Sequence, residues 1–136
     1  LFWSRDGQRV ALRYPGDGQY YIYSVAGESL GTLGELAPDA WAFPNHSPDG
    51  RYWAEYEVAD PARPWLVDLY LYGDDGTKVN LTHRPFERPR QLPSWSPDGQ
   101  SIVFSYGIAG IYAVSADGSA WLKLGDGSAP SWLWGS

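Results

Sequence analysis

A short turn motif occurs three times along this chain, and it constrains the fold more than any other feature of the sequence. The copies are Ser4-Arg5-Asp6-Gly7, Ser47-Pro48-Asp49-Gly50 and Ser96-Pro97-Asp98-Gly99. Asp-Gly pairs favour tight turns, because glycine adopts positive backbone angles without strain. The aspartates of successive copies, at positions 6, 49 and 98, are 43 and 49 residues apart. This spacing suits a unit of four short strands, so the sequence predicts a tandem repeat of small sheets.

The residues after each turn follow the same order in all three copies. An apolar run comes first, and then an aliphatic residue beside a tyrosine, a turn glycine and a leucine. The apolar runs are Val10-Ala11-Leu12, Trp53-Ala54 and Ile102-Val103-Phe104. Since these runs are apolar at consecutive positions, we expect both faces of each sheet to be covered. Sheets packed around an axis meet this condition, whereas a two-sheet sandwich leaves one face of each sheet in water.

The repeat resembles that of the TolB-like β-propellers, which also occurs in the propeller domains of prolyl-oligopeptidase and dipeptidyl-peptidase relatives. The residues that carry the resemblance are Trp95 to Gln100, Ile102-Val103-Phe104, Ile111-Tyr112 and Asp117-Gly118. It covers essentially the whole chain and is strongest in the third copy. The resemblance implies an all-β propeller fragment of three four-stranded blades, at about 1–40, 41–92 and 93–128. A further strand at 129–136 would begin another blade.

Three blades cannot close a ring, and TolB-like propellers usually have six or more. We therefore expect residues 1–136 to form a single propeller segment, two copies of which close a six-bladed ring as a homodimer. Strand 129–136 would pair with the first blade of the partner. The alternative is a piece of a longer propeller, since the chain starts at Leu1 and contains no methionine. An assembled form is favoured, because an isolated half ring buries little apolar area for its size.

Composition and motifs limit the classes of function. The formal net charge is −6 with ten basic residues, so nucleic acid is not expected as a partner. No apolar run approaches membrane-spanning length, so membrane insertion is not expected either. The absence of cysteine excludes thiolate catalysis and cysteine-based zinc sites. The sequence contains no Gly-x-Ser-x-Gly nucleophile elbow, no His-Glu-x-x-His zinc motif and no glycine-rich nucleotide-binding motif. We predict a chain that is not an enzyme and has no cofactor or metal site.

Functional residues are expected where the repeat is broken. His46 stands three residues before the turn aspartate, where the other copies have Trp3 and Trp95. Histidine at this position could be a ligand contact or a pH-sensitive group. The alternative is a neutral histidine that is hydrogen-bonded between neighbouring sheets.

Two carboxylates form the second departure from the repeat. Glu55 takes the place of an apolar residue in the other copies, and Glu57 follows on the same strand face. A pair of carboxylates at this spacing could bind a cation or the amine of a substrate. The alternative is that both are solvated or paired with Arg51 or Arg63.

Two long loops in the second repeat form the third departure. The loop at 59–65 ends in Trp65, and the loop at 83–90 gathers a basic and aromatic set in an acidic chain. This set consists of His83, Arg84, Phe86, Arg88 and Arg90. Since guanidinium groups bind carboxylates in a bidentate manner, the loop predicts a site for an acidic peptide or a carboxylate. The alternative is a rigid, proline-rich connector whose arginines are solvated.

Together these features favour a non-catalytic binding or scaffold module for a protein or peptide partner, which also assembles with itself. The resemblance to TolB-like proteins implies a periplasmic or extracellular location. One alternative is a gating propeller of a peptidase-like hydrolase whose catalytic domain lies outside this chain. Another is a purely structural unit whose only activity is to close a ring.

Overall fold

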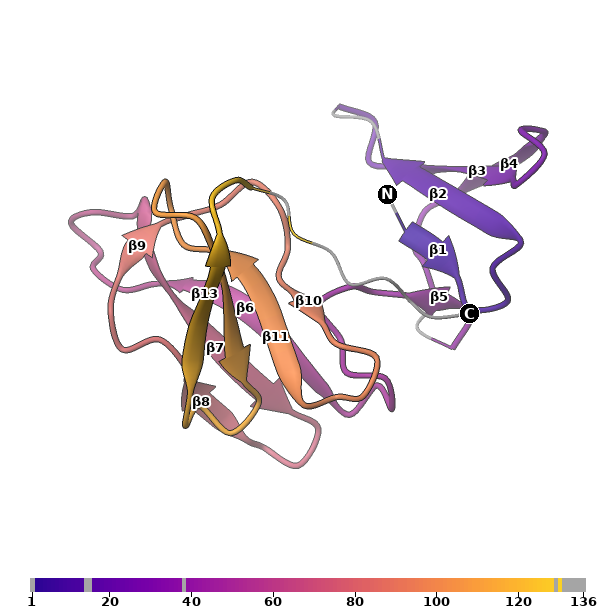
Figure 1. Ribbon diagram of the computed structural model, residues 1–136. Coiled ribbons are helices and arrows are strands. Elements are labelled where there is room, and N and C mark those ends of the chain that lie inside the picture. The colour runs from indigo at the N-terminus through magenta and orange to yellow at the C-terminus, as the bar shows by residue number, and fades with distance from the viewer. Residues whose placement is uncertain (1, 14–15, 38, 129, 131–136) are drawn as a thin grey trace. The chain divides into compact units, whose positions relative to one another are not determined.

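The computed structural model describes residues 2–13, 16–37, 39–128 and 130. In these residues the chain forms thirteen β-strands and no helix (Figure 1), which confirms the predicted all-β class. The strands form three antiparallel sheets, and the chain divides into two compact units, Leu1–Phe43 and Pro44–Ser136. In the same residues there is no helix long and apolar enough to cross a membrane. The strand predicted at 129–136 lies outside the described residues, apart from Pro130.

The first unit is one sheet with the strand order β4-β3-β2-β1-β5. Its strands are β1 (Phe2–Ser4), β2 (Arg9–Arg13), β3 (Tyr20–Ser24), β4 (Ser29–Leu33) and β5 (Trp41–Ala42). The predicted boundaries place residues 41–42 in the second repeat, but β5 pairs with β1. Trp41 is almost completely buried in the small core of this unit, together with Ala11, Ile22 and Leu36. Burial of the indole ring therefore accounts for the fifth strand.

The second sheet begins the second unit and has an interrupted outer edge. Its strands are β6 (Tyr52–Val58), β7 (Leu66–Gly73), β8 (Lys78–Asn80) and β9 (Phe86–Glu87). Both β8 and β9 pair with β7. Asn80 of β8 lies opposite Tyr70, and Phe86 of β9 lies opposite Val67. The first strand expected in this repeat is reduced to one bridge between His46 and Trp53. This sheet consequently departs from a regular four-stranded meander at both edges.

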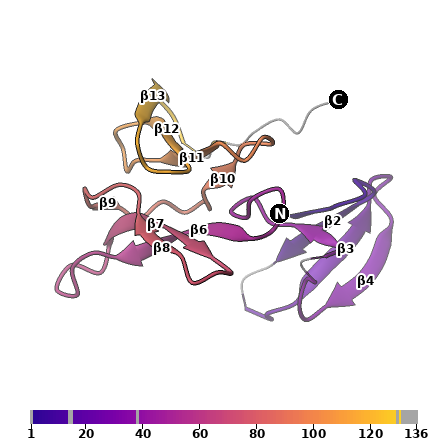
Figure 2. The same ribbon diagram turned by 90° about the horizontal axis from the view of Figure 1, so that it is seen from below.

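The third sheet is the four-stranded meander that the repeat predicts. Its strands are β10 (Ser94–Trp95), β11 (Ser101–Ser105), β12 (Ile111–Ser115) and β13 (Trp121–Gly125), in sequence order. The second and third sheets form two layers in Figure 2, and one apolar core lies between them. Its buried members are Ala54, Val67, Leu69, Leu71, Leu81, Phe86, Trp95, Ile102, Phe104 and Val114. Face-to-face packing is therefore present for this pair of neighbouring repeats.

The three predicted Ser-x-Asp-Gly turns share one hydrogen-bond pattern. In each turn the serine hydroxyl donates to the aspartate carboxylate, which also accepts the backbone N–H two residues further on. The serine oxygen accepts the N–H five residues on, and the glycine has a φ of 70° to 75°. The serine-to-aspartate distances are 2.5 Å for Ser4–Asp6, 2.6 Å for Ser47–Asp49 and 2.6 Å for Ser96–Asp98. The motif thus fixes how the second strand of each repeat begins.

The third sheet contains a further turn of this type at 115–118, where the repeat pattern predicts only a turn glycine. Ser115 donates to Asp117 at 2.7 Å, and Gly118 has a φ of 76°. In every sheet a backbone hydrogen bond joins the first turn to the second. These bonds run from Val25 to Gln8 (3.0 Å), from Asp74 to Arg51 (2.9 Å) and from Ala116 to Gln100 (2.9 Å). The two turns of each sheet therefore lie at the same end.

The second unit has two chemically different ends. We call the end that carries the turns at 47–50, 73–76, 96–99 and 115–118 the turn end. The opposite end carries the loops at 59–65, 81–85 and 106–110, and we call it the loop end. Figure 1 shows the turns at the lower end of this unit and β9 near the opposite end. Since the turns contain most of the aspartates of this unit, its arginine-rich segment at 83–90 begins far from them along the strands.

Candidate binding site

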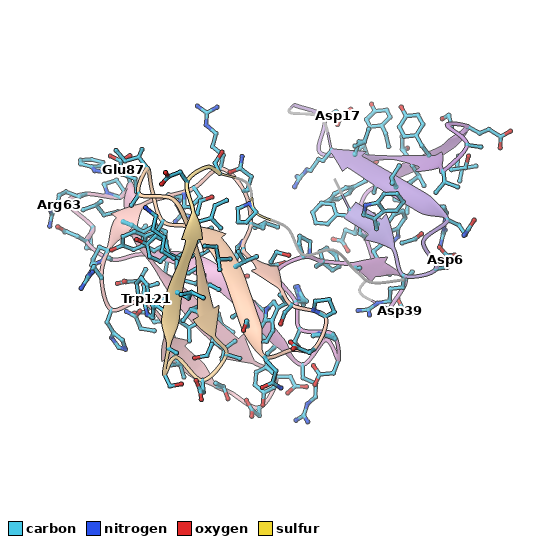
Figure 3. All side chains as sticks on the ribbon, in the orientation of Figure 1. Asp6, Asp17, Asp39, Arg63, Glu87 and Trp121 are labelled. Carbon is cyan, nitrogen blue, oxygen red and sulfur yellow. The ribbon has the colours of Figure 1, made fainter. Side chains whose placement is uncertain are left out.

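The loop end of the second unit is held together by the start of β7. The loop at 59–65 is closed by a backbone hydrogen bond from Ala59 to Leu66 at 2.9 Å, and β9 pairs with the same stretch of β7. The N–H of Arg88 then donates to the carbonyl oxygen of Trp65 at 2.9 Å. Figure 3 shows Arg63 and Glu87 at this same end of the unit. The two loops that the sequence singled out are therefore brought together.

Arginine side chains give the loop end its cationic character. Arg63 forms an ion pair with Asp60, with 2.8 Å between Nε and Oδ2. By contrast, Arg84, Arg88 and Arg90 are exposed and form no ion pair with any residue in the described part of the chain. The predicted patch thus offers exposed guanidinium groups that form no ion pair with the described residues, although the exposed Glu87 lies in the same segment.

Exposed apolar groups accompany these arginines. Trp65 is 56% exposed, and Ile108 in the loop at 106–110 is 99% exposed. That loop lies against the arginine segment, because the hydroxyl of Tyr106 donates to the carbonyl oxygen of Arg84 at 3.3 Å. The loop end therefore combines cationic and apolar surface from both sheets.

Phe86 lies in the apolar core and not on the surface, although its segment is rich in arginine. It is only 5% exposed, and its ring centroid lies 5.6 Å from that of Phe104 and 4.7 Å from that of Tyr106. The reason is its register on β9, which places Phe86 opposite the fully buried Val67. Phe86 therefore anchors the segment that presents the arginines and does not itself offer a contact surface.

The backbone turn at Asn80 directs the chain into the arginine segment. The side-chain oxygen of Asn80 accepts the N–H of Thr82 at 3.0 Å and the N–H of His83 at 2.8 Å. His83 has a φ of 47° and is exposed, and it is the one residue other than glycine with positive φ among those described. The Thr82 hydroxyl donates to the buried Asp68 at 2.7 Å, which fixes the other side of the turn. His83 therefore lies at the entrance to the patch.

His46 lies away from this patch, beside the second sheet. Its Nδ1 is 3.1 Å from Oδ1 of Asn45, and its ring stacks on Trp53 with 6.1 Å between the centroids. The ring is therefore within hydrogen-bonding distance of the adjacent Asn45 and stacked within the second sheet, so these contacts do not join neighbouring sheets as the alternative expected.

The two glutamates lie on the face of β6 that points away from the core. Tyr72 donates a hydrogen bond to Glu57, and Lys78 lies 3.2 Å from the same carboxylate. The bond from Tyr72 lowers the pKa of Glu57, and Lys78 lowers it further although partial burial opposes both effects. The predicted pairing with Arg51 or Arg63 is wrong, since those arginines pair with Asp74 and Asp60.

Lys78 also lies over two aromatic rings on this face. Its Nζ is 5.2 Å from the ring centroid of Tyr70 and 5.7 Å from that of Tyr72. Glu55 is exposed on the same strand face. Glu57 lies near the loop end of β6 but on the strand face opposite to that of Tyr56, and His46 directly precedes the turn at 47–50. The predicted residues that the loop end brings together are Trp65, His83, Arg84, Phe86 and Arg88.

Two tyrosines at the loop end were missed as site residues. Tyr106 contacts the arginine segment, as described above, and Tyr56 packs its ring edge-on against Phe86 with 5.9 Å between the centroids. Burial raises the pKa of Tyr56, whereas the charge of Arg88 lowers it. Tyr56 stands between the two glutamates in sequence, so strand alternation was the signal that placed it on the core face.

No family model matches the sequence, and no curated protein matches it either. Within residues 2–13, 16–37, 39–128 and 130, no group of three or more His, Cys, Asp or Glu side chains is placed to hold a metal ion. The TolB-like resemblance therefore stays a prediction from the repeat, and the candidate site stands on its own geometry.

Proposed function

We propose that the three sheets are successive blades of a β-propeller and that the chain is a non-catalytic binding module. Its loop end docks protein or peptide segments that carry carboxylates. The propeller hypothesis is supported by the shared turn geometry and by the packing of the second sheet on the third. The resemblance to TolB-like proteins adds the proposal of a periplasmic or extracellular location.

The observation that carries this function is the set of exposed guanidinium groups without internal ion pairs. Arginine presents a planar fork of N–H donors that matches the two oxygens of a carboxylate. Arg84 and Arg88 flank the buried Phe86, so the backbone between them is anchored before a ligand arrives. Exposed Trp65 adds an aromatic surface of the kind that dominates binding energy at protein interfaces. A strand-paired backbone with exposed cationic side chains suits an extended acidic partner.

The net charge of −6 does not prevent this association. At about 0.15 M salt the Debye length is about 8 Å, so charges at distant turns are largely screened. Guanidinium groups in direct contact with the ligand are screened much less. The local charge of the loop end consequently decides the partner.

The direct test is a binding titration with a labelled hexaglutamate peptide that is blocked at both ends. Fluorescence anisotropy at about 0.15 M salt would compare the unmodified chain with a variant carrying Arg84→Gln and Arg88→Gln. Each lost charge-assisted hydrogen bond is worth about 1.5–3 kcal/mol, so we expect Kd to rise at least about tenfold.

The matched control for this experiment is Arg51→Gln, because Arg51 is at the turn end and pairs with Asp74 at 3.5 Å. Its Kd should stay within about twofold of the unmodified value, since rim charges distant from a site contribute little. An unchanged Kd in the double variant, or an equal loss in the control, would refute the proposed site.

Self-association is a second proposed role, and the exposed side of β13 favours it. Leu122 and Leu124 are 64% and 52% exposed. Leu122 follows Trp121, which packs on the core, and Leu124 lies where the pairing of β13 with β12 shifts by one residue. We propose that a second copy covers this face and forms a dimer.

Light scattering after size exclusion should then give twice the chain mass of 15.1 kDa. The paired substitutions Leu122→Lys and Leu124→Lys should return the mass to that of one chain. The substitution Val25→Lys, at an exposed position in a turn of the first unit, should leave the dimer intact. A single-chain mass for the unmodified protein would exclude the dimer.

A further inference from the structure

The hydroxyl group of Tyr56 is an anomaly in the second unit. Its oxygen is buried, yet it has no hydrogen-bond partner among the described residues. Buried polar groups in folded proteins nearly always have a partner, and the exceptions often mark a functional site. The hydroxyl of Tyr56 is therefore a hydrogen-bond donor that no described residue of the chain accepts.

The register of the strands places this hydroxyl near the loop end. Tyr56 lies opposite Leu69 on the core-facing side of β6, and β6 ends two residues later at Val58. Its ring meets Phe86 edge-on. Tyr56 is thus the last aromatic residue of the core before the loop at 59–65.

Arg88 reaches the same side of the sheet. Its N–H donates to Trp65, so the pairing of β9 with β7 continues one step beyond Glu87. Since side chains alternate along a strand, Arg88 falls on the face of Phe86. The charge of Arg88 lowers the pKa of Tyr56, against the larger effect of burial, which raises it.

Tyr106 borders the same region from the third sheet. Its ring centroid is 4.7 Å from that of Phe86, and its hydroxyl already donates to the carbonyl oxygen of Arg84. The hydroxyl of Tyr106 is therefore used in binding the backbone of the arginine segment, whereas the hydroxyl of Tyr56 donates no hydrogen bond to a described residue.

We propose that Tyr56 and Arg88 together bind one side-chain carboxylate of the partner peptide. The hydroxyl donates to one carboxylate oxygen and the guanidinium donates to the other. Because Arg88 is exposed on a long and flexible side chain, it can move aside while the carboxylate enters. This inference rests on the proposed function and assigns the innermost contact of its site.

The test is Tyr56→Phe, which removes one oxygen atom and keeps the ring that packs on Phe86. Because the lost hydroxyl has no partner in the free chain, the urea midpoint should stay the same or rise. The Kd for the blocked hexaglutamate peptide should rise about fivefold to tenfold, since a hydrogen bond to a charged group is lost. A blocked hexaglutamine peptide should bind the unmodified chain and the variant equally weakly.

The control is Tyr52→Phe, on the same strand but at the turn end, where its hydroxyl contacts Asp75 at 3.5 Å. This variant should leave the Kd unchanged. If Tyr56→Phe also leaves it unchanged while the Arg84 and Arg88 double variant weakens binding, the tyrosine contact is wrong and the proposed function stands. If neither variant weakens binding, both proposals fail. A clear drop in the urea midpoint of Tyr56→Phe would also overturn the inference, because the hydroxyl would then be satisfied without a ligand.

Discussion

Replacing Phe86 with alanine should destabilise the second unit far more than the position of this residue in an arginine-rich segment suggests. Its ring is 95% removed from solvent and lies against the rings of Tyr56, Phe104 and Tyr106 at 5.9, 5.6 and 4.7 Å. Loss of a buried phenylalanine ring costs about 3–5 kcal/mol, including the cavity that remains. Since β9 is only two residues long and can partly collapse, we expect about 3 kcal/mol.

This loss is measurable as a shift of the urea unfolding transition, followed by far-ultraviolet circular dichroism of the full chain. Hydrogen exchange would show which unit is affected, and we expect faster exchange within Pro44–Ser136 but not within Leu1–Phe43. The control is Trp65→Ala, whose exposed ring should cost no more than about 0.5 kcal/mol. A cost below about 1 kcal/mol for Phe86→Ala, or equal costs for the two variants, would refute the assignment of Phe86 to the core.

Two further predictions concern the loop and turn backbone. In urea unfolding, Gly110→Ala should destabilise the chain more than Gly127→Ala. The two glycines have similar backbone angles, with φ of 120° and 127°. Only at Gly110, however, would the new Cβ lie 2.5 Å from a backbone oxygen, that of Gly125. The strain of positive φ alone costs about 1–3 kcal/mol, so equal losses would contradict the predicted clash. Stability should also fall as the pH is lowered, because hydrogen bonds from serine lower the pKa of the turn carboxylates Asp6, Asp49 and Asp98. For Asp117 the hydrogen bond from the Ser119 side chain is the largest effect, and the pKa falls to about 2. A carboxylate with a depressed native pKa stabilises the fold above about pH 4 and loses this effect as the pH falls toward 2, so a melting temperature that stays constant over this range would be contrary to expectation.

Local features of the fold were predictable because they depend on residues close together in sequence. A Ser-x-Asp-Gly turn is closed by its own side chains, as in Ser96–Gly99, and so the turns and the all-β class follow from the motif alone. The placement of residues 41–42 did not follow, because Trp41 joins β1 through burial with Ala11 and Ile22. A repeat boundary records similarity between sequences, whereas strand pairing depends on the core that the indole ring can reach.

The exposed charges of the candidate site were predictable from the sequence, but its buried residues were not. The exposure of Arg84 and Arg88 follows from a polar loop rich in proline. The burial of Phe86 follows from the two-residue pairing of β9 with β7, which no local pattern announces. The same limit applies to Tyr56, whose unpartnered hydroxyl depends on the packing of two sheets.

The most direct test of the binding site is a nuclear magnetic resonance titration of the full chain with the blocked hexaglutamate peptide. If the loop end binds the peptide, amide and arginine Nε–H signals should shift at 63–66, 83–90 and 106–108, while those of the turns at 47–50 and 96–99 should stay unchanged. Shifts concentrated at those turns, or no shifts at peptide concentrations well above the measured Kd, would contradict it.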